Sequence, residues 1–387
     1  MILDAFPSPE EFYKTYWNKK PFAVRGGVDP AIFETLIDAD TLAGLSLEED
    51  IKSRLIITQE GGGKWACEHG PFDDDRYENI GDKNWSLLVQ NVEQYHTETS
   101  ALLQHFNFAP RWLMDDIMVS YSATGGSVGP HIDSYHVFLT QGMGKRQWKV
   151  SNAAIENAEY IEGQDLKVLK HPFDGETIEV TAGDVIYIPP HFAHEGITLD
   201  HAMTFSVGFL GPTQAEIFAD FAYHLEQVSA QNKRYSGTDL NAESAQYSIS
   251  NSAQTSLQND LIAALQSDEF SIWLAEYFSK PTHDDIESLD MREEALSEDE
   301  LIEKSRGGAK LYKPNHIKLT ITQTQSGEQI IAVLGLRIPT PQKHAALIRA
   351  LNENQILSGE IIEKNIDAIA SLYNHFILEF ASEDGNG

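Results

Sequence analysis

Residues Gly129–Val150 read GPHIDSYHVFLTQGMGKRQWKV, and the stretch DVIYIPPHFAHEGIT follows at Asp184–Thr198. The first stretch places His131 and Asp133 on either side of Ile132. Side chains alternate between the faces of a strand, so His131 and Asp133 point one way and Ile132 points into the opposite layer. Two imidazoles and one carboxylate on one face of a metal form the facial triad of non-haem Fe(II) oxygenases. With His194 from the second stretch, the sequence predicts an iron site that keeps open positions for a co-substrate and O₂.

The surroundings of these residues strengthen the prediction, because a His-x-Asp pattern alone arises often by chance. The turn Gly125–Pro130 precedes the pattern and delivers a strand that begins at His131. The second histidine, His194, follows the strand candidate Val185–Ile188 and a Pro-Pro turn. In a jelly roll these two strands would lie beside each other across the mouth of the barrel.

A basic residue, Arg146, lies on the strand region just after the first two members of the triad. A planar guanidinium binds a carboxylate in bidentate fashion. This geometry fits the distal carboxylate of 2-oxoglutarate, whose keto-acid end would chelate the iron. The alternative is that Arg146 is a surface charge beside Lys145.

Ordinary hydrogen-bonded histidines are the alternative for His131 and His194, and for either one alone that interpretation is the more common. The pairing with Asp133 and the strand context favour a metal site. His191 is the nearest rival to His194, since it lies three residues away. The remaining histidines near the motifs are interpreted as surface or supporting groups without metal, and they are His136, His171 and His201.

The bulk composition limits the class of protein. At 387 residues the chain is long enough for two or three domains, and 41% hydrophobic residues indicate a globular protein. One cysteine, Cys67, excludes an intrachain disulfide and suits a reducing cytoplasm. We see no signal peptide and no apolar run long enough for a membrane span.

The formal net charge of −31 argues against direct nucleic-acid binding, because phosphates need Lys and Arg partners. The same charge favours a cationic protein or peptide partner through long-range steering. An equally open interpretation is that the acidity only provides solubility.

The first part of the chain, to about Gly211, is rich in strand and turn signals, which predicts an all-β sandwich or jelly roll decorated by helices. Its strand candidates are Phe22–Val24, Ser86–Val92, Asp116–Ser122, Val137–Thr140, Gln147–Val150, Thr177–Val180, Val185–Ile188 and Ala202–Gly208.

After Gly211 the pattern changes to helical spacing. Thr213 with Glu216 predicts a capping box, and helices are expected at Ala215–Ala230, Thr255–Gln266 and Glu269–Tyr277. The apolar content of these helices exceeds what they bury alone, so packing against a second copy is expected. An acidic stretch follows at Pro281–Lys304, interpreted as a solvated linker or helix face. The remainder predicts an α+β module with strands Ile317–Thr322 and Ile330–Leu336 and helices Pro341–Asn352 and Ile361–Glu379.

The chain resembles the bacterial Jumonji-C ribosomal oxygenases. The similar stretches are the entry motif Trp17–Pro21, WSLLVQNVEQYH (Trp85–His96), DDIMVSYSATGGSVGPHID (Asp115–Asp133), VFLTQGMGKRQWKV (Val137–Val150) and GDVIYIPPHFAHEGIT…SVGF (Gly183–Phe209). The resemblance implies mixed α and β structure in three parts. They are a double-stranded β-helix (jelly roll or cupin) JmjC domain at residues 1–211, a helical dimerisation region at 212–282, and an acidic linker with a winged-helix-like domain at 283–387.

The family pattern also assigns roles to residues. Its metal triad falls on His131, Asp133 and His194, which selects His194 over His191, and its 2-oxoglutarate-binding arginine falls on Arg146. Support of the co-substrate is expected from Ser122, Thr204 and Ser206. The bacterial members of the family resemble the enzyme that hydroxylates an arginyl residue of large-subunit ribosomal protein sixteen. The implied activity is therefore hydroxylation, at C3, of an arginyl residue of a large-subunit ribosomal protein, with Fe(II), 2-oxoglutarate and O₂. A cytoplasmic homodimer is expected.

Two other functions remain open at this level. In the first, the same chemistry acts on another protein or on a small molecule. The helical and C-terminal regions argue against a small molecule, because a small substrate does not need them. The other is a non-catalytic cupin module that holds a metal for structure. The position left open by only three ligands argues against it.

Overall fold

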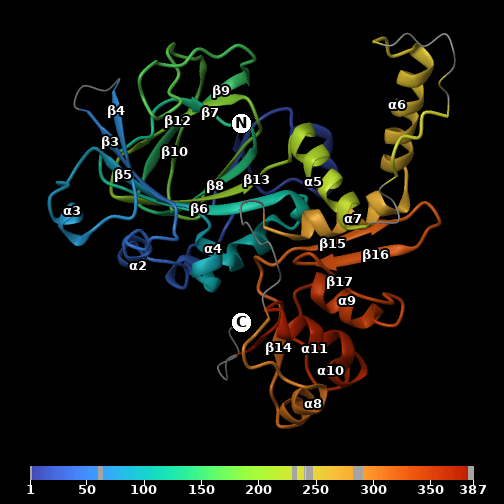
Figure 1. Cartoon of the computed structure of the whole chain (residues 1–387). Coiled ribbons are helices and arrows are strands. Elements are labelled where there is room, and N and C mark those ends of the chain that lie inside the picture. The colour runs from blue at the N-terminus through green and yellow to red at the C-terminus, as the bar shows by residue number, and fades with distance from the viewer. Residues whose placement is uncertain are drawn as a thin grey trace. The chain divides into compact units, whose positions relative to one another are not determined.

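The computed structural model describes residues 2–59, 64–228, 233–238, 240, 247–281 and 291–381. The chain divides into two compact units, Met1–Gly211 and Pro212–Gly387 (Figure 1). The last two residues of the helix expected at Ala215–Ala230 and residues 282–290 of the acidic stretch lie outside the described residues.

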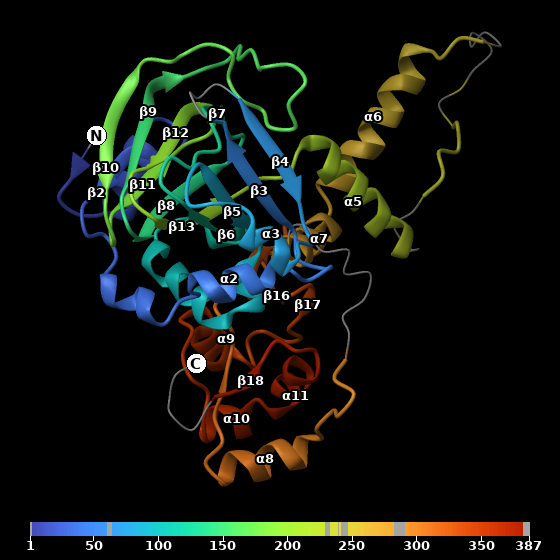
Figure 2. The ribbon, with the colours of Figure 1, turned by 90° about the vertical axis from the view of Figure 1, so that its left-hand side faces the viewer.

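Two β-sheets form the first unit (Figures 1 and 2). The larger has the order β1 (Ile2–Leu3), β2 (Phe22–Val24), β11 (Val185–Ile188), β8 (His136–Met143), β13 (Ala202–Phe209), β6 (Met114–Ser122), β5 (Trp85–Val89), β3 (Ser53–Thr58) and β4 (Trp65–His69). The smaller has the order β10 (Gly175–Val180), β9 (Arg146–Ala154), β12 (Phe192–Thr198) and β7 (His131–Ile132). The predicted jelly roll is confirmed.

The central strand β13 explains how this barrel positions polar groups inside. Phe205 and Val207 pack into the core outside the barrel, and the intervening Thr204 and Ser206 therefore point to its interior. Both faces of the strand are covered, so all eight of its residues are buried.

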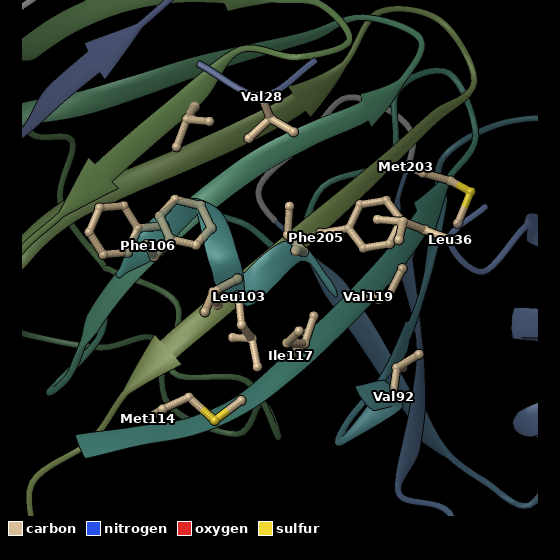
Figure 3. Close-up of a cluster of buried hydrophobic side chains, with 14 of the residues drawn as sticks. Val28, Leu36, Val92, Leu103, Phe106, Met114, Ile117, Val119, Met203 and Phe205 are labelled. Carbon is tan, nitrogen blue, oxygen red and sulfur yellow. The ribbon is translucent and has the colours of Figure 1, made fainter. Parts of the chain in front are cut away.

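An apolar core fills each side of the larger sheet. Between the two sheets, Leu139 and Ile186 pack against Trp148 and Val150 of β9. On the outer face, η3 (Thr97–Phe106) inserts Leu103 and Phe106 against side chains of β6 and β13 (Figure 3). The other helical segments of this unit are α1 (Pro9–Glu11), η1 (Phe12–Tyr16), η2 (Pro30–Glu34), α2 (Ala39–Leu45), α3 (Asp74–Glu78), α4 (Val92–Tyr95) and η4 (Arg111–Leu113).

The structure corrects several predicted boundaries. The strand expected at Ser86–Val92 ends at Val89, because Asn91 adopts a left-handed conformation and α4 begins at Val92. Four strands of the first unit were not predicted, namely β1, β3, β4 and β12. His194 lies on β12, which follows the Pro189-Pro190 turn, and the strand that begins at His131 pairs with β12 rather than with Val185–Ile188.

The second unit combines helices with two small sheets. The helices are α5 (Gln214–Gln227), α6 (Asn251–Leu265), α7 (Asp268–Ser279), α8 (Glu298–Arg306), α9 (Ala345–Asn352), α10 (Glu360–Lys364) and α11 (Ile366–Asn374). The sheets are β15 (Leu319–Gln323), β16 (Gln329–Val333) and β17 (Leu336–Arg337), and the pair β14 (Leu311–Tyr312) and β18 (Glu379–Phe380).

The local signals of this unit agree with the structure in part. The capping box of Thr213 and Glu216 is present at the start of α5. The helix expected at Ile361–Glu379 is divided at Asn365, and Glu379 belongs to β18. The described helices include none that is long and apolar enough to cross a membrane.

Candidate metal centre

The three predicted ligands meet where β7 pairs with β12. This pairing is antiparallel and places His131 directly opposite His194. Residues directly opposite each other in an antiparallel pair share a face of the sheet, so both imidazoles point into the barrel. Asp133 follows the last residue of β7 and reaches the same point.

The distances fit a single small cation. The Nε2 atom of His194 lies 3.4 Å from Oδ2 of Asp133, and that of His131 lies 3.9 Å from the same oxygen. One ligand atom from each residue lies within 4.8 Å of the others, and no other such group of three or more His, Cys, Asp or Glu occurs in the described part of the chain. The site therefore presents two nitrogens and one carboxylate.

Hydrogen bonds hold both imidazoles in the orientation that a metal needs. The Nδ1 atom of His131 bonds to the carbonyl oxygen of Gly129 at 2.9 Å, and that of His194 bonds to the carbonyl oxygen of Phe192 at 3.1 Å. A carbonyl oxygen only accepts, so each Nδ1 carries the proton and each Nε2 offers a lone pair. Burial, followed by the neighbouring His131, lowers the pKa of His194 to about 4, so its imidazole is neutral near pH 7.

A second layer supports the ligand strand from outside the barrel. Ile132 points away from the metal site and packs with Leu169 and Phe173 of the long β9–β10 connection and with Ala193 of β12. The backbone N–H of Leu169 also donates to the carbonyl of Pro130 at 2.8 Å. The segment that carries the triad is thus held on both of its faces.

The triad opens onto a cavity of about 370 Å³, a size in the range of small-molecule sites. Arg146, Thr204 and Ser206 line the same cavity. Its walls also include Met118, Ser120, Tyr135, Val137, Leu139 and Trp148, and the charged residues Arg54, Asp165 and Lys167 line it as well.

The Arg146 side chain is fully enclosed, with 3% of the residue exposed. Its Nη1 donates to Oγ1 of Thr204 at 3.3 Å and its Nη2 to the carbonyl of Gly196 at 3.5 Å. The guanidinium carbon lies 4.8 Å from the centre of the Trp148 ring. Burial lowers the pKa of Arg146 to about 10, which still leaves the group charged near pH 7.

A buried cation without an anionic partner is costly, and Arg146 is such a group. Within the described residues its Nε finds no hydrogen-bond partner, and none of the ion pairs there involves its guanidinium. A carboxylate of a ligand in the cavity would satisfy it. The residues present therefore fit both a divalent metal and a dicarboxylate.

The structure separates the three predicted hydroxyl residues. Thr204 and Ser206 line the cavity, whereas Ser122 does not. The Ser122 hydroxyl donates instead to Oγ of Ser86 at 2.8 Å, and Ser86 is the residue that reaches the cavity wall. Ser120, two residues earlier on β6, also lines the cavity and was not predicted, although strand alternation places it on the same face.

None of the other histidines discussed from the sequence belongs to the metal group. The ring of His136 stacks on Trp17 with centroids 3.5 Å apart and bonds through Nδ1 to the Tyr187 hydroxyl at 2.8 Å. Similarly, the ring of His201 bonds to the Tyr121 hydroxyl at 2.9 Å. These contacts give the side chains structural roles.

Comparison with known proteins agrees with this geometry. The JmjC domain family matches residues 101–217. Over 358 residues the chain is 33% identical to the ribosomal protein uL16 3-hydroxylase of Escherichia coli (strain K12), covering 90% of each protein. Over 211 residues it is 36% identical to a protein named as a probable ribosomal oxygenase of Haemophilus influenzae, covering 54% of this chain and 51% of that protein.

Solved structures show the same likeness. Escherichia coli YcfD matches with a TM-score of 0.83 at 30% identity, covering 97% of this chain and 98% of that one. The ribosomal oxygenase YcfD in complex with cobalt and 2-oxoglutarate matches with a TM-score of 0.79 at 31% identity, covering 96% and 98%. The fold and the triad define the class, which is the JmjC oxygenases that use Fe(II), 2-oxoglutarate and O₂. Within that class, the chain belongs to the ribosomal oxygenase family.

Proposed function

We propose that this protein hydroxylates C3 of an arginyl residue in a large-subunit ribosomal protein. The observation that carries the proposal is the buried Arg146 guanidinium, which has an unpartnered Nε and lines the same cavity as the triad. A metal site with only a structural role would not need a buried guanidinium that can bind an anionic ligand. The ribosomal substrate is supported by the similarity to the uL16 3-hydroxylase.

In this mechanism Nε2 of His131, Nε2 of His194 and the Asp133 carboxylate hold Fe(II). The bound iron supplies the redox chemistry that couples oxidative decarboxylation of 2-oxoglutarate to hydroxylation of a C–H bond. Arg146 binds the distal carboxylate and so orients the co-substrate. The apolar side chains of Val137, Leu139 and Trp148 narrow the cavity and exclude water from the reacting centre.

The entrance side of the cavity has chemistry that suits an arginyl side chain. An arginine has an apolar stem and a cationic end, and Met118 and Tyr135 offer apolar walls for the stem. The carboxylate of Asp165 also lines the cavity, and the net charge of −31 favours a cationic target.

The test is incubation of the protein with Fe(II), 2-oxoglutarate and isolated ribosomal proteins, with intact-mass and peptide mass spectrometry as the readout. We expect one large-subunit protein to gain a single oxygen on an arginyl residue, with succinate formed in equal amount. The matched control is Asp133→Ala, which should give neither product. Succinate formation without any modified ribosomal peptide would overturn the substrate assignment and favour a small-molecule substrate.

We also propose the predicted division of the second unit into a helical dimerisation region at residues 212–282 and an acidic linker with a winged-helix-like domain at 283–387. Large apolar side chains of α5 and α6 are exposed in the monomer, which supports self-association. The apolar cluster built from α8–α11 and β14–β16 supports a C-terminal core, on whose strand β16 Ala275 of α7 also packs. A ribosomal substrate is consistent with the expected cytoplasmic location.

A further inference from the structure

Gly196 on β12 occupies a position where a side chain would crowd two neighbouring side chains. It lies opposite Trp148 in the register of β12 and β9. A Cβ at this position would come within 2.7 Å of Nε of Arg146 and within 2.8 Å of two atoms of the Trp148 ring. The backbone of Gly196 is not in the left-handed region, so the need for glycine comes from these two side chains.

The space left by the missing Cβ is the space that the Arg146 side chain uses. The Arg146 side chain extends from β9 over β12 at this point. The Trp148 ring lies beside its guanidinium, and the Gly196 carbonyl accepts a hydrogen bond from Nη2. The glycine therefore sets how deeply the guanidinium can lie against the sheet.

A chain of buried hydrogen bonds, which we call the relay, fixes the Nη1 end of the guanidinium through Thr204 and Gln141. Nη1 of Arg146 donates to Oγ1 of Thr204, and Oγ1 of Thr204 donates to Oε1 of Gln141 at 3.2 Å. Gln141 is itself held, because its Nε2 donates to the carbonyls of Met143 at 2.6 Å and Met203 at 3.1 Å. The Thr204 hydrogen points to Gln141, so a lone pair of the hydroxyl faces Arg146.

We infer that Gly196 and Gln141 are positioning residues that seat the Arg146 guanidinium for the distal carboxylate of 2-oxoglutarate. Neither lines the cavity, so each acts through Arg146. Arginine has five N–H donors. Two of them bond to Thr204 and Gly196, which leaves donors for a bidentate carboxylate. The inference rests on the proposed function, which makes 2-oxoglutarate the ligand of Arg146.

The experiment measures two affinities on the full-length protein, that for Mn(II) alone and that of the Mn(II)-loaded protein for 2-oxoglutarate, both by calorimetry. Gly196→Ala should weaken 2-oxoglutarate binding about tenfold or more and leave Mn(II) affinity within about twofold, since a lost charge-assisted contact is worth roughly a factor of ten. Gln141→Met should weaken 2-oxoglutarate in the same direction. Thr204→Ser should keep the affinity and Thr204→Val should lose it, because only the hydroxyl carries the relay.

Controls make a purely structural effect visible. Gly211→Ala is the matched glycine variant, because its Cβ would meet nothing closer than Leu113 at 3.8 Å, and it should bind both ligands normally. A 2-oxo acid without a distal carboxylate, 2-oxobutyrate, should bind the wild type and Gly196→Ala equally.

Three results would overturn the inference. The first is wild-type 2-oxoglutarate affinity in both Gly196→Ala and Gln141→Met. The second is an equal loss of Mn(II) and 2-oxoglutarate binding with a lowered melting temperature, which would indicate general distortion. The third is a failure of the Mn(II)-loaded wild type to bind 2-oxoglutarate, and this one alone also removes the proposed function.

Discussion

The backbone N–H of His191 donates a 2.9 Å hydrogen bond to the backbone carbonyl of Asp133. His191 has a φ of 67°, in the left-handed region, and its own carbonyl accepts from the N–H of Ile155 at 2.8 Å. This residue therefore ties the turn after β11 to the metal-ligand segment through its main chain. Its side chain is not part of the metal group, whereas that of His194 is.

The first prediction separates these two histidines. His194→Ala removes one of three ligands and should weaken Mn(II) or Co(II) binding about a hundredfold or more, with loss of hydroxylation. His191→Asn should keep metal affinity within a few-fold, because asparagine tolerates the left-handed conformation. Calorimetric titration of each variant with the metal measures both affinities. If His194→Ala bound the metal tightly and His191→Asn did not, the third ligand would have to be assigned to His191.

The second prediction concerns the cost of burying Arg146. Arg146→Met removes a buried cation that has no anionic partner among the described residues, so the protein without ligands should be as stable as the wild type or more stable by about 1–4 kcal/mol. The wild type should gain about 2.7 kcal/mol from 2-oxoglutarate at a hundred times its Kd in the presence of Mn(II), and the variant should gain nothing. Chemical denaturation with and without the co-substrate measures both effects. Equal stabilisation of the two proteins would exclude Arg146 as the anchor.

The third prediction is a pH dependence of stability from Glu93 on α4. Its carboxyl oxygen Oε2 accepts from the backbone N–H of Ile117 at 2.8 Å, and burial raises the pKa of Glu93 to about 8. The unfolded carboxyl loses its proton near pH 4.5 but the folded one keeps it, so this group lowers the free energy of unfolding progressively as pH rises from about 4.5 to about 8. The slope from one such group is at most about 1.4 kcal/mol per pH unit.

Glu93→Gln keeps an acceptor for Ile117 and removes the titration. We expect the variant to match the wild type near pH 4.5 and to be more stable at pH 8 by up to a few kcal/mol. Urea denaturation at both pH values provides the measurement. A wild-type stability advantage that grows with pH would show that Glu93 is ionised in the folded protein.

The parts of the site that follow from local sequence were predictable. Strand alternation places His131 and Asp133 on one face, and the position of Arg146 on β9 follows from its place in the same stretch. Strand β12 was missed because Gly196 and the polar residues His194 and Glu195 interrupt its apolar pattern, and a short run of this kind does not distinguish a strand from a turn. The ligand was found, but the strand that carries it was not.

Contacts that depend on register between distant strands were not predictable. The roles of Gly196 and Gln141 arise only when β12, β9, β8 and β13 are aligned, since Arg146 and Gly196 are 50 positions apart and Gln141 and Thr204 are 63 positions apart. For Ser122 the local pattern predicts the face of the strand correctly but does not predict whether the side chain lines the cavity. Alternation puts it on the inward face of β6 with Ser120, but its hydroxyl bonds to Ser86 of the neighbouring strand, and Ser86 lines the cavity instead.

The fourth prediction tests dimerisation through the helices of the second unit. The side chains concerned are large, apolar and exposed in the monomer, with exposed fractions of 55% for Phe218, 38% for Leu257, 65% for Leu261 and 49% for Ile262. Each sits on α5 or α6, and burying such a surface in a symmetric pair would remove it from water at about 25 cal/mol per Å². The double variant Phe218→Glu/Leu261→Glu should therefore be monomeric where the wild type is dimeric.

Size-exclusion chromatography with light scattering gives the mass of each species directly. The matched control is Leu199→Glu, which changes an apolar residue of the first unit with 40% exposure and should leave the mass unchanged. The monomeric variant should keep Mn(II) affinity, because the metal ligands all belong to β7, the residue after it and β12. A monomeric wild type at micromolar concentration would refute the dimerisation proposal. A double variant that stays dimeric would move the interface away from α5 and α6.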